Sequence, residues 1–351
     1  MSLTPETVGV IAGLTTSAFW VLTTIFFTAG GKRIGVTAVN TLRMFFAVIL
    51  LGATHLLIFK TFVPQVPSNM QWGALALSGF IGLTICDQAL FAAFLDIGPR
   101  RALLVMTSTP IFALTFGYLI LHEKIGIVAL TGIAITIAGI AWVVLQRQTS
   151  GNGERHPHLI RGYTLAIIGS VCQSLGAMFA KIGMGSGETA VDPLAATLVR
   201  MIFGLLCMTP IVLVSYRMVK KREPGSAKLR WTPGILFTLG GTIFGPFLGV
   251  WLSLVAIRSV ELGIAQTLLS LSPVMILPFV GKLYSEKLTR AAILGAVIAV
   301  AGAGVISMSG RIEQLIGMHD ELPDEETGDA AGHPAGERPA HHSPRPDPRK
   351  V

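Results

Sequence analysis

The chain has 351 residues, of which 52% are hydrophobic and only 13% are charged, and its formal net charge is +8. Soluble domains carry about 25% charged residues, so this composition excludes an ordinary water-soluble protein. It also argues against a nucleic-acid-binding protein, because the basic residues lie in short loops between apolar runs, where anionic lipid headgroups are the favoured partners.

Hydrophobic runs recur from Thr7 to Met308. Each is roughly 20 residues long, enough to cross a hydrocarbon core about 30 Å thick at about 1.5 Å per residue. No basic stretch precedes the first run, so we expect a retained helix rather than a signal peptide. The ten predicted transmembrane helices are 7–29, 37–59, 71–95, 99–121, 124–146, 160–183, 192–216, 232–256, 260–281 and 288–308.

The predicted helices form two similar sets. Residues 1–146 and 160–308 each contain five helices, residues 147–159 form a polar linker, and residues 309–351 are expected to be a disordered tail. Because each set has an odd number of helices, the second should enter the membrane inverted, a recurrent transporter design. The sets match at Pro110, Glu123, Gly132 and Gly139, which recur 163 residues later as Pro273, Glu286, Gly295 and Gly302.

Ionisable residues within the hydrophobic runs are the first candidates for function, because each costs about 2.5–3.5 kcal/mol to insert into lipid unless it is paired or lines a wet cavity. Arg43 and Asp87 should reach the same depth on antiparallel helices, which predicts a buried ion pair. This pair either locks the two helices or takes part in anion binding or proton coupling.

Arg43 recurs 157 residues later as Arg200, whereas the position that corresponds to Asp87 is Val250. The sequence therefore offers no carboxylate partner for Arg200. This side chain either faces a cavity, where it would bind a carboxylate of a solute, or extends to the lipid headgroups.

Pro110 and Pro273 interrupt two corresponding helices, and such paired breaks point to a binding site near the membrane midplane. The alternative is a kink that serves packing alone. Six polar or aromatic residues are candidate walls of the site, with helix packing as the alternative for each: Trp20, Gln88, Gln173, Trp251, Gln266 and Ser270.

Three charged residues lie near the ends of predicted helices. Lys181 either binds an anionic group or anchors its helix at the membrane interface. Glu123 and Glu286 are interpreted as loop or capping residues, with gating as the alternative. The sequence has no Walker pattern and no catalytic triad, and Cys86, Cys172 and Cys207 form no CxxC pair. We therefore expect no enzyme activity, cofactor or metal site.

These features resemble the EamA-like members of the drug/metabolite transporter superfamily. The resemblance implies a ten-helix secondary carrier of the plasma or inner membrane that exports amino acids, metabolites or toxic compounds. It covers both halves and rests on Trp20, Arg43, Gly98-Pro99-Arg100-Arg101-Ala102, Ser108-Thr109-Pro110, Glu123, Gly132 and Gly139, with Ser270, Ser272-Pro273, Glu286, Gly295 and Gly302 in the second copy.

The leading hypothesis is thus a gradient-driven carrier of a small solute, with protons as a candidate coupling ion. Two other classes stay open: a non-transporting scaffold or sensor that signals through the tail, and a membrane enzyme acting on lipid-linked substrates. The orientation of the termini is also open. Basic residues concentrate in the loops on the side opposite the termini, and basic short loops stay in the cytoplasm, which places both termini outside; the family resemblance places them in the cytoplasm.

Overall fold

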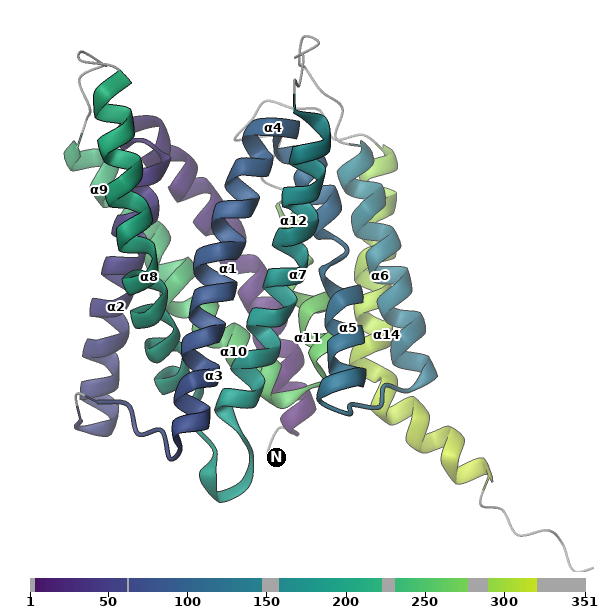
Figure 1. Ribbon diagram of the computed structural model, residues 1–351. Coiled ribbons are helices and arrows are strands. Elements are labelled where there is room, and N and C mark those ends of the chain that lie inside the picture. The colour runs from purple at the N-terminus through teal and green to yellow at the C-terminus, as the bar shows by residue number, and fades with distance from the viewer. Residues whose placement is uncertain (1–3, 62, 147–157, 223–230, 277–289, 321–351) are drawn as a thin grey trace, which may run out of the picture. The chain divides into compact units, whose positions relative to one another are not determined.

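The computed structural model describes residues 4–61, 63–146, 158–222, 231–276 and 290–320. These residues form helices joined by short turns (Figure 1). In chain order the helices are α1 (Pro5–Ile34), α2 (Val36–Phe59), α3 (Asn69–Gly79), the π-helix η1 (Phe80–Ile85), α4 (Cys86–Met106), α5 (Thr109–Ile120), α6 (Ile127–Gln146), α7 (Leu159–Met184), the 3-10 turn η2 (Gly187–Thr189), α8 (Pro193–Arg222), α9 (Trp231–Thr242), the π-helix η3 (Ile243–Gly249), α10 (Val250–Ser259), α11 (Leu262–Leu269), α12 (Ser272–Met275) and α14 (Arg290–Asp320).

Within the described residues, nine helical segments are long and apolar enough to cross a membrane. A shorter apolar helix, Leu262–Met275, falls within the segment predicted at 260–281. Residues 277–289, which include Glu286, lie outside the part of the chain that the structure describes. The predicted all-helical membrane fold is therefore confirmed, whereas the count of ten spans is not established by these residues.

Two predicted helix boundaries differ from the structure. The sequence predicts a turn before Pro99, but α4 continues through this residue to Met106, although proline removes one backbone hydrogen-bond donor there. The adjacent spans are still separate, at Asn69–Leu90 and Arg101–Ile120. At the other end of the chain, α14 continues beyond Met308 to Asp320, and residues 321–351 of the predicted tail lie outside the described residues.

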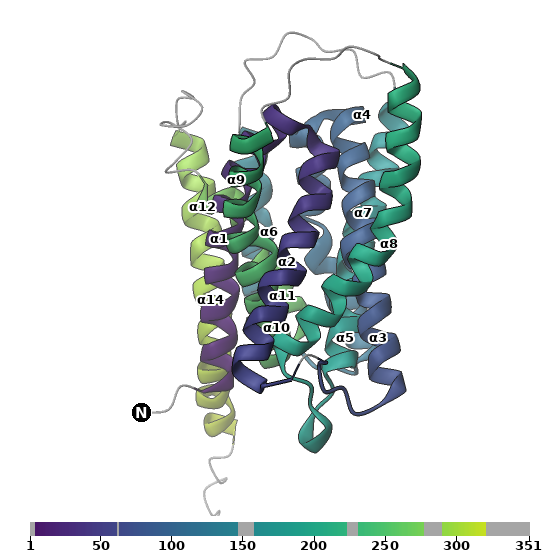
Figure 2. The ribbon, with the colours of Figure 1, turned by 90° about the vertical axis from the view of Figure 1, so that its left-hand side faces the viewer.

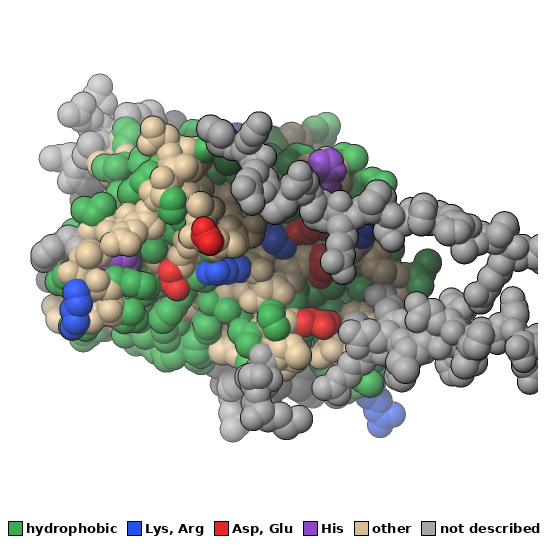
Figure 3. Space-filling view, turned by 90° about the horizontal axis from the view of Figure 1, so that it is seen from below, with side chains coloured by type: hydrophobic (Ala, Val, Ile, Leu, Met, Phe, Trp, Pro, Cys, Tyr) green, Lys and Arg blue, Asp and Glu red, His purple; other side chains and the backbone are tan. Residues whose placement is uncertain are grey.

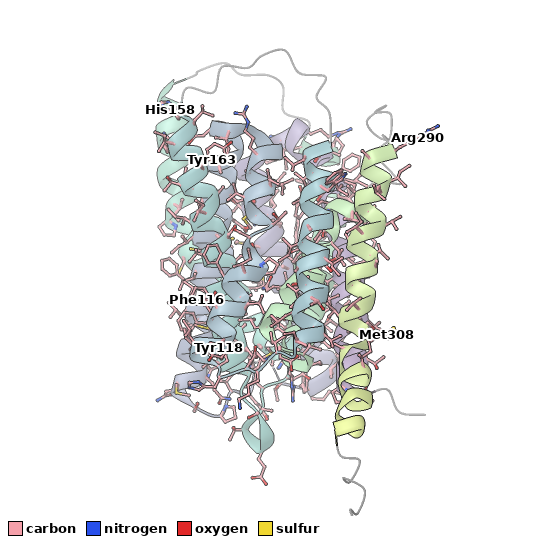
Figure 4. The ribbon with its side chains drawn as sticks, turned by 90° about the vertical axis from the view of Figure 1, so that its right-hand side faces the viewer. Phe116, Tyr118, His158, Tyr163, Arg290 and Met308 are labelled. Atoms are coloured by element: carbon pink, nitrogen blue, oxygen red, sulfur yellow. The ribbon has the colours of Figure 1, made fainter. Side chains whose placement is uncertain are left out.

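Large hydrophobic side chains cover much of the outer surface. Ile160 is 85% exposed and Ile127 is 77% exposed. Tyr118 and Met308, which are labelled in Figure 4, also lie on the surface rather than in the core. A soluble monomer rarely exposes so much apolar area, so this surface is suited to contact with lipid.

The duplication predicted from the sequence is visible in the helix boundaries. The break between α4 and α5 follows Met106, and the break between α11 and α12 follows Leu269, 163 residues later. The two π-helices start at Phe80 and Ile243, with the same displacement. Each repeat thus carries the same irregularities at the same places.

Each repeat packs its first helix against the other repeat. The first helix of the chain, α1, contacts α9, η3 and α10, and its counterpart α7 contacts α3, η1 and α4. Figure 2 shows α1 and α9 side by side. The second helices of the repeats, α2 and α8, contact each other. Because these contacts are reciprocal, the cavity described below lies between the repeats and not within one of them.

Glycines bring the last helices of the two repeats, α6 and α14, into close contact. A Cβ atom added at Gly132 would lie 2.9 Å from the backbone nitrogen of Ile306, and one at Gly302 would lie 2.8 Å from the carbonyl oxygen of Gly132. Further along α6, Gly139 faces Ala299. Residue numbers rise along α6 from Gly132 to Gly139, while those of their neighbours on α14 fall from Ile306 to Ala299. These two helices are therefore antiparallel. The repeated glycines of the sequence pattern thus serve helix packing.

Candidate functional site

The ion pair predicted between Arg43 and Asp87 is present and joins α2 to α4. Its side chains are 15% and 21% exposed. The guanidinium of Arg43 also lies 5.8 Å from the ring centre of Phe27, a cation–π distance. Both charged residues belong to the first repeat, so the pair neutralises the arginine inside that repeat.

The helix breaks at the two prolines do not leave free carbonyls for a solute. Pro110 removes the donor for the carbonyl of Met106, which instead accepts a hydrogen bond from the Thr109 hydroxyl at 2.7 Å. In the second repeat, Ser17 of α1 donates to the carbonyl of Leu269 at 3.0 Å. Both carbonyls that lose a backbone donor at the prolines therefore accept a hydrogen bond from a hydroxyl group.

A small polar cavity lies between the repeats. Its volume is about 40 Å³, room for roughly three water molecules at ~10–15 Å³ each. The first repeat contributes residues of α1 and η1, and the second repeat contributes residues of α7, α8, α10 and α11. The lining consists of Trp20, Gly82, Leu83, Gln173, Ala177, Arg200, Val250, Ser253, Ile257, Gln266 and Leu269.

Arg200 is the charged group of this cavity. The residue is only 6% exposed, so it does not extend to the lipid headgroups. Its Nε has no hydrogen-bond partner, and among the described residues no carboxylate forms an ion pair with it. This arrangement supports the interpretation in which Arg200 faces a cavity.

Two glycines let α8 approach closely enough to place Arg200. A Cβ atom at Gly79 would overlap the backbone carbonyl of Arg200. At Gly82, an added Cβ would lie 3.4 Å from Arg200 Nη2 and 3.2 Å from the Cα of Gly176 on α7. The π-helix η1 thus brings a residue without a side chain to the cavity wall. The sequence analysis did not single out these glycines as site residues.

Four of the nine predicted substrate-binding residues line the cavity, namely Trp20, Gln173, Arg200 and Gln266. Two of the other predicted residues, Arg43 and Asp87, form the ion pair described above. Gln88 donates to the sulfur of Met208 at 3.2 Å, and Trp251 packs within a hydrophobic cluster beside Phe247. The remaining residue, Ser270, donates its hydroxyl hydrogen to the carbonyl of Gln266 at 2.7 Å. These five residues are therefore not among the cavity lining.

Lys181 and Glu123 form an ion pair between the two repeats, with 2.6 Å between Nζ and Oε1. The same ammonium donates to the carbonyl of Val260 at 2.6 Å. The second carboxylate oxygen of Glu123 accepts a hydrogen bond from the backbone nitrogen of Leu262 at 2.8 Å, at the start of α11. Lys181 is therefore not a free anchor for lipid headgroups. The network connects the α5–α6 turn, α7 and the α10–α11 turn.

This ion pair lies at the end of the bundle that contains the N-terminus. Gly9 of α1 contacts Val260 there, and a depression of about 220 Å³ is lined by Glu6, Lys124 and Glu261 among others. Figure 3 views this end and shows acidic and basic side chains close together among hydrophobic ones. The charged groups at this end hold the two repeats together.

A second ion pair joins the repeats through the other end of α7. Arg161 Nε lies 2.9 Å from Asp96 Oδ2, although the two groups are not aligned for a hydrogen bond. The side chain of Asp96 is 7% exposed and that of Arg161 is 63% exposed. Figure 4 labels His158, the residue before α7, at the end of the bundle opposite Tyr118. The two inter-repeat ion pairs therefore lie toward opposite ends of the bundle.

The hydrophobic surface, the duplicated helices and the polar cavity between the repeats define a multi-pass membrane protein of two-repeat architecture. The pattern of the EamA-like transporter family matches residues 7–145 and 160–308, and the chain belongs to this family. No curated protein sequence matches the chain. A solved crystal structure is 18% identical and covers 90% of this chain, with 99% of its own chain covered and a TM-score of 0.66. At this identity it shows a similar fold.

Proposed function

We propose that this chain is a gradient-driven carrier that moves a small solute across the membrane by alternating access. The observation that carries the proposal is the position of the polar cavity, which borders helices of both repeats and contains a buried arginine. A change in the relative position of the repeats would open such a cavity to one side of the membrane or the other. Membership of a transporter family supports this function.

The proposal includes an inverted relationship between the two repeats. The antiparallel contact of α6 with α14 supports it, because these helices occupy the same place in their respective repeats. The reciprocal packing of α1 and α7 against the other repeat also supports it. Two inverted copies can exchange conformations, so each would provide the closed end of the cavity in one of two states.

The ion pairs Glu123–Lys181 and Asp96–Arg161 are the proposed gates of the two ends. Lys181 and Arg161 are separated by twenty residues of α7, or about 30 Å at ~1.5 Å per residue. Both pairs join residues of different repeats. With both pairs formed, the cavity of about 40 Å³ is smaller than a typical metabolite site of ~300–1,000 Å³. The conformation described here would therefore be an occluded state between transport steps.

Asp87 is the proposed proton-coupling group, because it is a membrane carboxylate paired with Arg43, and protonation would break this ion pair. The family resemblance supports export of metabolites, amino acids or drugs from the cell, across the plasma or inner membrane. Under this proposal the solute and the proton move in opposite directions. No nucleic-acid partner is involved.

Flux in proteoliposomes tests the proposed function. The purified chain would be reconstituted with a panel of amino acids, small carboxylates and cationic drugs, and movement of each would be followed with and without an imposed pH gradient. We expect gradient-dependent flux of at least one class. The matched variant Lys181→Met, which breaks one gate, should allow exchange but reduce accumulation against a gradient. Folded protein that moves no member in either direction would contradict the proposal.

A further inference from the structure

The two repeats differ in how they neutralise their equivalent arginines. Arg43 lies seven residues after the start of α2, and Arg200 lies seven residues after the start of α8. Arg43 has Asp87 as its ion-pair partner. The position corresponding to Asp87 in the second repeat is Val250, and Val250 lines the same cavity as Arg200. The second repeat therefore has the arginine and the place for its partner, but no carboxylate there.

No described residue compensates for this difference. Arg200 is the one ionisable side chain in the cavity lining, and that lining contains no Asp or Glu. Its burial to 6% exposure separates it from solvent, and its Nε has no hydrogen-bond partner. A buried positive charge without a counter-charge is unfavourable. The cavity therefore attracts one negative charge.

The neutral polar groups of the cavity favour the same kind of ligand. Trp20 and Gln266 line the cavity, and their side chains carry an indole N–H and an amide. Gln173 accepts a weak bond from the Cys86 thiol at 3.4 Å, which leaves its amide hydrogens available. The residues that share the cavity with Arg200 thus carry several N–H donors, as expected for a site that binds oxygen atoms carrying negative charge.

We propose that the solute supplies the missing carboxylate, so that the cavity binds small monocarboxylates with an apolar body. This inference rests on the proposed function in one respect, namely that the cavity is the place where the transported solute binds. A guanidinium binds a planar carboxylate through two parallel hydrogen bonds, which a spherical inorganic anion cannot reproduce. Leu83, Ile257 and Leu269 provide apolar walls for the rest of the molecule. A larger body requires the repeats to separate from the occluded conformation.

Calorimetric titration of the full-length protein in detergent tests this specificity. The probes are acetate, butyrate and benzoate, each compared with its neutral amide of nearly the same shape, and sodium chloride as an inorganic anion. We expect the acids to bind more tightly than their amides by roughly ten- to a hundredfold, the range for a charge-assisted hydrogen bond. Chloride should not displace the acids at equal concentration.

Two substitutions separate charge from folding. Arg200→Gln removes the cation, and Val250→Asp provides the carboxylate that the first repeat has at the corresponding position. Both should reduce the preference for acids over amides to about equality. Val250→Asp should do so without lowering the thermal unfolding temperature, because Arg200 then has an internal partner. Arg258→Gln, which removes an arginine of α10 outside the cavity lining, is the matched control and should leave the preference unchanged.

Equal affinity for acids and amides in the native protein would overturn the inference, as would an unchanged preference in a folded Val250→Asp variant. Displacement of benzoate by an equal concentration of chloride would assign the site to inorganic anions and would also overturn it. The test is separable from the proposed function. Gradient-driven flux of neutral solutes without acid preference would contradict this inference alone, whereas acid-selective binding without any flux would contradict the carrier function alone.

Discussion

Breaking the Glu123–Lys181 ion pair should open the cavity toward the side of the N-terminus. Removing one partner of a fully buried ion pair costs about 3–5 kcal/mol, whereas an exposed pair contributes about 0.2–1 kcal/mol. The side chains of Lys181 and Glu123 are 22% and 11% exposed, so we expect Lys181→Met to destabilise the closed end by about 2 kcal/mol. This energy corresponds to a roughly 30-fold larger population that is open at that end.

Thiol labelling from each side of the membrane measures this population. Cys86, Cys172 and Cys207 would be replaced, and Ser253 of the cavity lining would be changed to cysteine. A membrane-impermeant thiol reagent added on the side of the N-terminus should react roughly 30-fold faster after Lys181→Met, if labelling follows the open population. The rate from the opposite side should not increase.

The matched control is Arg161→Met, which breaks the other inter-repeat ion pair. The side chain of Arg161 is 63% exposed, so solvent screens the pair and the expected effect is about 0.5 kcal/mol, or roughly twofold. Any increase in labelling should come from the side opposite to the N-terminus. The reasoning fails if Lys181→Met leaves labelling unchanged, or if both variants open the same side.

Three further predictions concern packing, coupling and the tail. Gly139→Ala should lower stability by about 1–3 kcal/mol, because its methyl group overlaps the backbone of α14, whereas Gly304→Ala should not; thermal unfolding of the two variants in parallel decides this. Asp87→Asn should abolish the effect of a pH gradient on flux while exchange continues, so undiminished coupling would exclude Asp87 as the proton site. Deleting residues 321–351 should leave flux intact, and loss of flux in a folded truncation would favour a sensor function.

The Arg43–Asp87 pair shows what sequence reasoning can reach. Both residues lie in adjacent antiparallel helices of one repeat, so their depth follows from counting residues along each helix. The insertion cost of each charge then requires a partner. The residue count along each helix and the cost of inserting a charge into lipid were enough to predict the contact, and the structure contains it.

The Lys181–Glu123 pair shows where such reasoning stops. These residues belong to different repeats. The sequence left Lys181 as either an anion-binding residue or an interfacial anchor, and it assigned Glu123 to a loop or cap, with gating as the alternative. Their contact depends on how α7 packs against the α5–α6 turn and the α10–α11 turn. A residue count cannot predict this packing, because it fixes depth along a helix but not which neighbouring helix a side chain faces.

By itself, the sequence determined that this chain spans a membrane many times, that it contains two matching sets of helices, and that its charged membrane residues require partners. Hydrophobic length, repeat spacing and the insertion cost of charge are properties of short segments, so they can be read without a structure. Only the tertiary structure decided which residues form the cavity. Arg200, Gln173 and Gln266 line the cavity, whereas Gln88 bonds to Met208 and Trp251 packs in a hydrophobic cluster. The sequence could not separate these residues, because the direction of a side chain depends on contacts between distant helices.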